Sequence, residues 1–368
     1  MTDDVLIIGA GVIGLSLAYE LSGHGLSVRL IDRAAPAREA SWAGAGILPP
    51  AKRGAVEHPY EDLAGLSHEL LPRWTEQLRE ETGIDNGLRR WGAVHLATTP
   101  EEAERLEAMA ALWQARQVVA EPLSTEALQD REAAVATEHV LAAYHLPEEA
   151  QIRNPRHLKA LLVGCTRRGV HLEAGCEAQS FHVAAGRIRH VHTSRGKRAA
   201  GAVCIAAGAW SRAVVDELKL TLTIKPVRGQ IVLLTGDRPL HRHIINRGSR
   251  YIVPRPDGRI LVGSTEDDVG FDKRTTAEGI RELLNFACEL IPALGQLEVE
   301  RCWAGLRPQT SDGFPYLGRV PELENAFVAA GHFRAGLTLS PATAVVMSQL
   351  IRGEQPEVDL RPFRVDRA

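Results

Sequence analysis

The residues with the clearest chemical signature lie near the N-terminus. Gly9-Ala10-Gly11-Val12-Ile13-Gly14 has the GxGxxG spacing. Its glycines allow a tight turn, a close approach of backbone to a pyrophosphate, and close packing of a helix on a strand. The unbonded amides of the first helical turn and the helix dipole favour an anion there without any lysine. Asp32 follows about 20 residues later, where a carboxylate hydrogen-bonds a ribose hydroxyl and disfavours a 2′-phosphate. These residues predict a dinucleotide site.

The glycine motif does not by itself identify the cofactor. Adenosine diphosphate is common to NAD and FAD, so both fit the fingerprint. The alternative without a ligand is a glycine-rich turn in a parallel sheet. The surrounding elements favour the dinucleotide, because the motif needs a strand before it and a helix after it.

The local pattern supplies those elements. Val5 to Ile8 is a short apolar run, Ile13 to Leu21 repeats apolar residues at helical spacing, and Val28 to Ile31 is a second apolar run. The order is strand, turn, helix, strand. It places the glycines at the carboxyl end of the first strand, where ligands bind in open α/β sheets.

Further elements follow along the chain. Asn154 is expected to cap a helix with Pro155 in its first turn. Turn residues separate several short strands in a β-rich stretch after Gly201. The predicted helices are 62–81, 101–117, 156–168, 276–290 and 336–350, and the predicted strands are 93–96, 203–205 and several between 227 and 263.

Length and composition narrow the class of protein. A chain of 368 residues exceeds one ordinary core, so two packed domains are expected. With 24% charged residues and a formal net charge of -3, the chain lacks the basic footprint of a nucleic-acid binder, and a small ligand is favoured. Five scattered cysteines without CxxC spacing indicate a reducing compartment; they are Cys165, Cys176, Cys204, Cys288 and Cys302.

The apolar N-terminal stretch is not interpreted as a signal or membrane segment. Asp3 and Asp4 precede it where lysines would be expected, and the motif glycines interrupt it. No other stretch approaches the roughly 20 apolar residues that a spanning helix needs. We therefore expect a cytoplasmic protein with no membrane contact.

Several motifs beyond Asp32 carry a resemblance to a known family. In order they are Ala40-Ser41-Trp42-Ala43-Gly44-Ala45-Gly46-Ile47-Leu48, Ala206-Ala207-Gly208-Ala209-Trp210-Ser211, Tyr251-Ile252-Val253-Pro254-Arg255, Gly263-Ser264-Thr265, Trp303-Ala304-Gly305-Leu306-Arg307-Pro308, Asp312-Gly313-Phe314-Pro315-Tyr316-Leu317-Gly318, and the run from Ala330 to Thr343. Together they resemble the D-amino acid oxidase superfamily of flavoproteins, and within it the bacterial glycine oxidases of thiamine biosynthesis. The resemblance covers essentially the whole chain, and its last blocks are the most specific.

The resemblance implies an α/β fold with two domains. A discontinuous Rossmann-like FAD-binding domain would comprise residues 1–85, 150–225 and 305–368. An α+β substrate-binding domain of mainly antiparallel sheet would comprise 86–149 and 226–304 and roof the flavin. The FAD is expected to be non-covalent. Sarcosine oxidases attach FAD through a cysteine in the region of Cys302, but Cys302 directly precedes Trp303 on a predicted strand, which argues against that bond.

The resemblance also implies cofactor contacts beyond the fingerprint. The helix after Gly336 would aim its N-terminus at the flavin pyrimidine ring and stabilise negative charge there; an ordinary buried helix is the alternative. His332 is expected to place backbone against the flavin rather than to accept a proton, and no metal is expected. The further cofactor residues are Arg33, Ser41, Ala43, Gly44, Gly46, Ile47, Ala207, Gly208, Trp210, Gly305, His332, Phe333, Arg334, Ala335, Gly336, Leu337 and Thr338.

Three residues are implied to bind the substrate. Arg307 would hold the amino acid carboxylate in a bidentate contact, Tyr251 would add a phenol hydrogen bond, and Arg334 would lie at the mouth of the site. Outside the motif each has a plainer interpretation. A lone arginine in a loop is usually solvated, and tyrosine is simply favoured in strands.

The implied reaction is the oxidative deamination of glycine, and possible further substrates are sarcosine and small D-amino acids. The α-hydrogen would pass as hydride to flavin N5, and the imine would hydrolyse to glyoxylate and ammonia. Oxygen would reoxidise the flavin and give hydrogen peroxide. In thiamine biosynthesis the imine would instead feed thiazole assembly, which links the protein to thiazole synthase. Relatives of this kind are commonly tetramers, so a homotetramer is expected.

Two positions depart from the family pattern. Ala207 stands where many relatives carry asparagine, which matters little if only backbone touches the cofactor. Glu266 stands where some glycine oxidases have an apolar residue; its carboxylate would either face solvent or favour substrates with a second amine.

Alternative functions remain open from the sequence. On the same scaffold they are a D-amino acid dehydrogenase or oxidase, a sarcosine oxidase and a non-catalytic flavin-binding protein. An NAD-dependent dehydrogenase is a further alternative, and it predicts a colourless protein.

Overall fold

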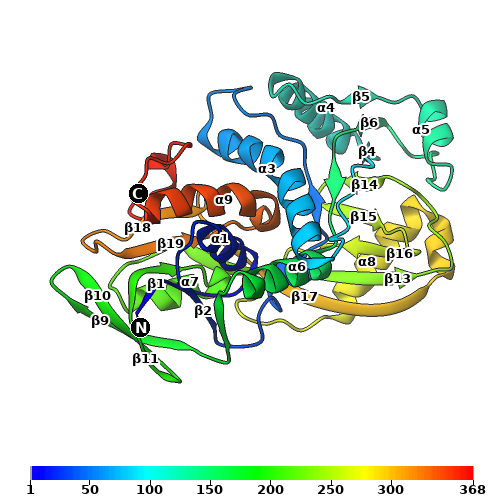
Figure 1. Cartoon of the computed structure of the whole chain (residues 1–368). Helices are drawn as coiled ribbons and strands as arrows, with labels where there is room; N and C mark the ends of the chain where they lie inside the picture. The colour runs from blue at the N-terminus through cyan, green and yellow to red at the C-terminus, as the bar shows by residue number, and fades with distance from the viewer. Residues whose placement is uncertain (1, 368) are drawn as a thin grey trace.

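Two large sheets organise the chain and occupy the left and right halves of Figure 1. In this computed structural model, which describes residues 2–367, the first sheet has the strand order β18-β19-β12-β1-β2-β8. Its neighbours are parallel except for the antiparallel pair β18 and β19. The strands are β1 (Asp3–Ile8), β2 (Val28–Asp32), β8 (His171–Ala174), β12 (Ala200–Ile205), β18 (Tyr316–Arg319) and β19 (Ala326–Ala330).

The N-terminal unit forms as predicted. β1 pairs with β2 in parallel, and α1 (Val12–Gly23) connects them. α1 packs against α6 (Asn154–Arg167) and α9 (Gly336–Ile351), and α3 (Pro59–Thr82) packs on both of these helices. Together the helices bury a large apolar core against one face of the sheet, because α1 is apolar around nearly its whole circumference.

The second sheet has the order β17-β13-β16-β15-β14-β4-β6-β5 and is antiparallel except for the parallel pair β14 and β4. One face packs on α8 (Ala277–Leu290), and the other carries a smaller apolar cluster. The predicted fold class is confirmed. Its strands are β4 (Ala93–Ala97), β5 (Glu121–Pro122), β6 (Ala142–Leu146), β13 (Ile224–Thr235), β14 (Ile244–Arg247), β15 (Arg250–Pro254), β16 (Arg259–Gly263) and β17 (Glu298–Thr310).

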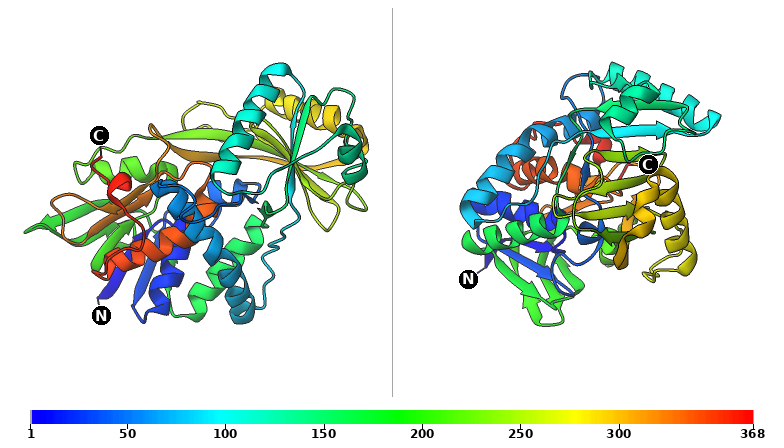
Figure 2. Two further views of the ribbon diagram at one scale, coloured as in Figure 1. Left: turned by 90° about the horizontal axis from the view of Figure 1, so that it is seen from above. Right: turned by 90° about the vertical axis from the view of Figure 1, so that its right-hand side faces the viewer.

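The longest strands run across the predicted domain boundaries. β13 and β17 pair from Ile224 opposite Thr310 to Thr235 opposite Glu298. Boundaries at 225 and 305 therefore fall inside this ribbon, while every other strand of the two large sheets lies within a segment predicted for its domain. The left view of Figure 2 shows both chain ends in the half of the molecule away from the second sheet. The division into domains itself stays a prediction.

The predicted helices agree with α3, α4 (Pro100–Ala115), α6, α8 and α9 to within a few residues. Thr276 caps α8 by accepting a hydrogen bond from the Gly279 amide. The prediction of Asn154 as a cap is wrong. Arg153 is the N-cap residue of α6, and the Asn154 amide instead donates to the Ser41 carbonyl at 2.8 Å, so a tertiary contact replaces the local cap.

Smaller elements complete the described chain. A separate three-stranded sheet packs on the far face of the first sheet and consists of β9 (Ala178–Ala184), β10 (Arg187–Thr193) and β11 (Gly196–Arg198). The others are α2 (Ala40–Ala43), α5 (Thr125–Arg131), α7 (Ser211–Asp216), β3 (Ile47–Leu48), β7 (Ala150–Gln151) and the 3-10 turns Gly208–Trp210, Pro292–Gln296 and Arg361–Phe363. Among residues 2–367, none of the helices has the length and apolar character needed to span a bilayer.

Candidate active site

One cavity of about 1020 Å³ is lined by residues of both large sheets. It is large enough for a dinucleotide together with a small substrate. Every residue predicted from the sequence to touch cofactor or substrate lines it except Ala10 and Gly14. The fold thus brings together segments that lie up to about 330 residues apart, although the individual role of each residue stays a prediction.

Each glycine of the GxGxxG turn is required, or suited to its place, for a different geometric reason. Gly9 has φ +110°, and a Cβ there would lie 2.4 Å from the Ala206 carbonyl oxygen. A Cβ on Gly14 would lie 1.9 Å from the Gly9 oxygen, so Gly14 packs α1 on the turn instead of lining the cavity. Gly11 is the N-cap residue of α1 and offers no side-chain cap, and the first turn holds no acidic residue. This end therefore fits a pyrophosphate.

Asp32 is held in place at the same end. Its Oδ2 accepts from the Ala10 amide at 2.8 Å and its Oδ1 from the Ala34 amide at 2.9 Å, while the residue lines the cavity. Ala10 therefore holds the Asp32 carboxylate through its amide and does not itself line the cavity. Nearby, the guanidinium carbon of Arg33 lies 4.0 Å from the centre of the Trp210 ring. Stacking of this kind keeps Arg33 oriented at the adenosine end.

Arg307 projects from β17 at the other end of the cavity. Its Nη2 donates to Ser264 Oγ at 2.7 Å and its Nη1 to the Thr265 carbonyl at 3.3 Å. No carboxylate in residues 2–367 forms an ion pair with it. Burial lowers the pKa of Arg307, and neighbouring Tyr251 opposes that shift. Arginine nevertheless stays protonated in proteins, so an uncompensated cation faces the cavity.

Two glycines within strands leave space for the side chains of Tyr251 and Arg307. Tyr251 on β15 lies opposite Gly263 on β16, and a Cβ on Gly263 would lie 2.6–2.7 Å from three atoms of the phenol ring. A Cβ on Gly229 would lie 2.2–2.4 Å from the guanidinium of Arg307. Gly229 was not predicted from the sequence, nor were Ser264 and Thr265 as partners of Arg307. A glycine inside a strand pattern is the signal that points to such a close approach.

The N-terminus of α9 borders the cavity beside these residues. Ala335 is its N-cap residue without a side-chain cap, and no acidic residue occupies the first turn. His332 is buried, contacts Thr343 Oγ1 at 3.1 Å, and has its pKa lowered to about 3 by burial. His332 is therefore neutral at pH 7.

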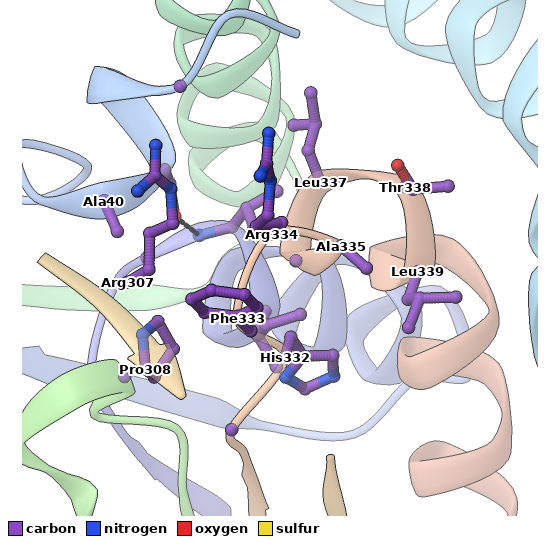
Figure 3. Close-up of a pocket in the computed structure, with 18 of the residues that line it drawn as sticks. Ala40, Arg307, Pro308, His332, Phe333, Arg334, Ala335, Leu337, Thr338 and Leu339 are labelled. Carbon is purple, nitrogen blue, oxygen red and sulfur yellow. Dashed lines mark hydrogen bonds between the residues drawn. The ribbon is translucent and has the colours of Figure 1, made fainter. Parts of the chain in front are cut away.

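Arg334 and Arg307 point the same way in Figure 3, one from the loop before α9 and one from β17. Arg334 donates to the Ser249 carbonyl at 3.0 Å and pairs with Glu266 at 3.3 Å. Glu266 therefore lies beside the substrate end of the cavity. Cys302, by contrast, packs with the core cluster under α8 and does not line the cavity.

The fold and this site define a dinucleotide-dependent oxidoreductase. A family model described as "FAD dependent oxidoreductase" (DAO) matches residues 4–350, and the chain belongs to this family. The predictions of family, enzyme class and FAD are thereby confirmed, and an NAD-dependent dehydrogenase is set aside.

Relatives of known description agree over full length. A glycine oxidase of Geobacillus kaustophilus is 36% identical over 370 residues, covering 99% of this chain and 97% of the relative. The crystal structure of glycine oxidase from Geobacillus kaustophilus has a TM-score of 0.94 at 34% identity and covers 100% of this chain and 99% of that one. A bifunctional protein ThiO/ThiG of Synechocystis sp. is 31% identical, covering 100% of this chain and 54% of that protein.

Proposed function

We propose that this protein is a glycine oxidase, with sarcosine and small D-amino acids as further substrates. The observation that carries the proposal is the uncompensated Arg307 beside Tyr251, in the same cavity as the GxGxxG turn. A buried cation with two parallel N–H donors fits one carboxylate, which is the handle common to these amino acids. The names of the full-length relatives support glycine among them.

The chain's own residues orient the substrate. Arg307 and Tyr251 hold the carboxylate, and the Ser264 and Thr265 oxygens fix the guanidinium plane. The residues that would hold FAD are the Gly9 to Gly14 turn, Asp32 and the N-terminus of α9, where helix-end amides favour negative charge. FAD, when bound, supplies the acceptor for the substrate hydrogen and passes two electrons to oxygen. The balanced reaction is glycine, oxygen and water giving glyoxylate, ammonia and hydrogen peroxide.

The direct test follows oxygen consumption by the purified, FAD-loaded protein. With glycine, we expect oxygen uptake with glyoxylate and peroxide formed in equal amounts. Sarcosine, D-alanine and D-proline tested in the same way rank the substrates. Oxidation of an amine without oxygen uptake, seen only with an artificial acceptor, would instead identify a dehydrogenase.

We extend the proposal to the use of the product. A relative of this chain forms part of a larger bifunctional ThiO/ThiG protein, which supports a functional link to a second activity. The imine would then supply thiazole assembly in thiamine biosynthesis, with thiazole synthase as the partner. In a coupled assay, thiazole formation is expected to require glycine and active oxidase; formation at the same rate without the oxidase would contradict the link.

We further propose that the protein works in the cytoplasm as a homotetramer. The five free cysteines, none of them in a disulfide within residues 2–367, support a reducing compartment. Light scattering of the FAD-loaded protein tests the assembly: a mass of four chains is expected, and a monomer at micromolar concentration would contradict it.

A further inference from the structure

The cations that line the cavity differ in whether a carboxylate already pairs with them. Arg116 pairs with Glu61 at 2.9 Å, Arg250 with Glu282 at 2.8 Å, and Arg334 with Glu266 at 3.3 Å. Arg33 stacks on Trp210 at the adenosine end. Within residues 2–367, this leaves Arg307 as the arginine of the substrate end that no carboxylate neutralises.

The short segment that follows β16 accepts hydrogen bonds from both Arg307 and Arg334. β16 ends at Gly263, and the next three residues supply Ser264 Oγ and the Thr265 carbonyl to Arg307 and the Glu266 carboxylate to Arg334. The other guanidinium nitrogen of Arg334 donates to the Ser249 carbonyl at 3.0 Å. Arg334 is thus occupied by groups of the chain, whereas Arg307 is supported only by neutral oxygens.

The charges of Arg334 and Glu266 both influence Arg307. Besides burial and Tyr251, the pKa of Arg307 is lowered by the charge of Arg334 and raised by that of Glu266. Arg334 and Glu266 therefore act on Arg307 in opposite directions. The substrate end therefore presents about one net positive charge, which suits a single carboxylate.

We propose that Glu266 is a specificity-determining residue that neutralises Arg334 and so selects substrates with one carboxylate over substrates with two. This inference rests on the proposed function, because it takes Arg307 as the site of the substrate carboxylate. A second anionic group near Arg334 meets the Glu266 carboxylate, and repulsion of this kind discriminates between ligands that bind the same anchor. The ligand class selected against is the N-carboxymethyl or β-carboxyl amino acid.

The first test compares glycine with iminodiacetate, which is glycine carrying a second carboxymethyl group on nitrogen. The readout is the ratio of kcat/KM for iminodiacetate to that for glycine. Glu266→Gln removes the charge and keeps the shape, and we expect this ratio to rise by up to about fivefold, as for one freed contact between exposed charges. The double variant Glu266→Gln, Arg334→Gln should return the ratio toward the parent value.

Glu278→Gln is the matched control. Glu278 also pairs with an arginine, Arg281, at 2.6 Å, but both lie on the exposed face of α8 and neither lines the cavity. The ratio in this variant should equal that of the parent. An unchanged ratio in Glu266→Gln overturns the proposal, and a rise that persists in the double variant overturns the assignment to Arg334.

A second test needs no turnover. Carboxylates without an amine perturb the spectrum of bound flavin, so dissociation constants for acetate and malonate can be compared in the same variants. We expect Glu266→Gln to tighten malonate relative to acetate by up to about fivefold, and the double variant to lose this gain. The same relative affinity in parent and Glu266→Gln overturns the inference. If malonate tightens but glycine is not oxidised, the proposed substrate is wrong while the role of Glu266 stands.

Discussion

At the scale of single residues, the proposed binding of the substrate depends on one arginine held by neutral oxygens. Arg307 lies between Ser264 Oγ and the Thr265 carbonyl and pairs with no carboxylate in the described chain. A cation in this setting is stabilised most when an anion arrives. The same setting makes the residue informative to change, because its removal leaves no other unpaired arginine at the substrate end.

Replacing Arg307 with alanine should separate cofactor binding from substrate binding. The variant is expected to keep its yellow FAD, because Arg307 is not among the residues expected to hold the cofactor, and to lose about 100-fold or more in kcat/KM for glycine. Flavin content and steady-state kinetics measure the two effects. Arg281→Ala, which removes an exposed arginine on α8, should match the parent. Equal activity in Arg307→Ala would remove the carboxylate contact from the account.

Gly229→Ala tests the space beneath the same guanidinium. A Cβ 2.2 Å from Nη2 forces Arg307 to move, so we expect KM for glycine to rise at least tenfold with normal flavin content. Gly295→Ala is the control, since its nearest neighbour is the Cys288 sulfur at an ordinary 3.4 Å. If Gly229→Ala keeps the parental KM, the close approach does not position Arg307.

At the scale of elements, a buried arginine ties the second sheet to the segments around α2 and β7. Arg255, just after β15, donates to Gln151 Oε1 at 2.6 Å, to the Ile152 carbonyl at 3.2 Å and to the Ala45 carbonyl at 2.6 Å. Arg255→Met should lower the free energy of unfolding by about 2–4 kcal/mol, because buried acceptors lose their donor. Urea unfolding measures it; an unchanged midpoint would show that these contacts contribute nothing net.

The sequence predicted elements better than the contacts between them. Local apolar periodicity predicts α1 and β2. The glycine-rich and small-residue motifs predict which residues line the cavity. Asn154 was assigned to a cap because local chemistry favours it, yet the Ser41 carbonyl 113 residues away binds its amide. The partner of Glu266 lies 68 residues along the chain, and only the tertiary fold brings Arg334, in the loop before α9, to the segment after β16. Long-range pairing of this kind leaves no local signal.

At the scale of the whole molecule, buried neutral histidines link stability to pH. Burial lowers the pKa of His332 to about 3 and that of His157 and His241 to about 4. In the unfolded chain each takes up a proton below about pH 6.5, so the unfolded state binds more protons. Stability from this source is complete above pH 6.5 and is lost as pH falls toward the folded values.

The resulting prediction is a fall in stability between pH 6.5 and 5, by roughly 1–2 kcal/mol for each histidine. Paired carboxylates add their loss only at lower pH, so this window isolates the imidazoles. Urea midpoints of the FAD-loaded protein at pH 7.5, 6.0 and 5.0 measure it. His157→Gln should reduce the fall by the share of one histidine, and a parental curve that is already flat would contradict the prediction.

The most direct test of the central claim is an anaerobic titration of the FAD-loaded protein with glycine, followed by the visible absorbance of oxidised flavin. We expect bleaching by glycine, recovery in air with one peroxide for each glycine oxidised, and no bleaching of Arg307→Ala at the same concentration. A parent protein that stays yellow with glycine, sarcosine and D-alanine alike would contradict it.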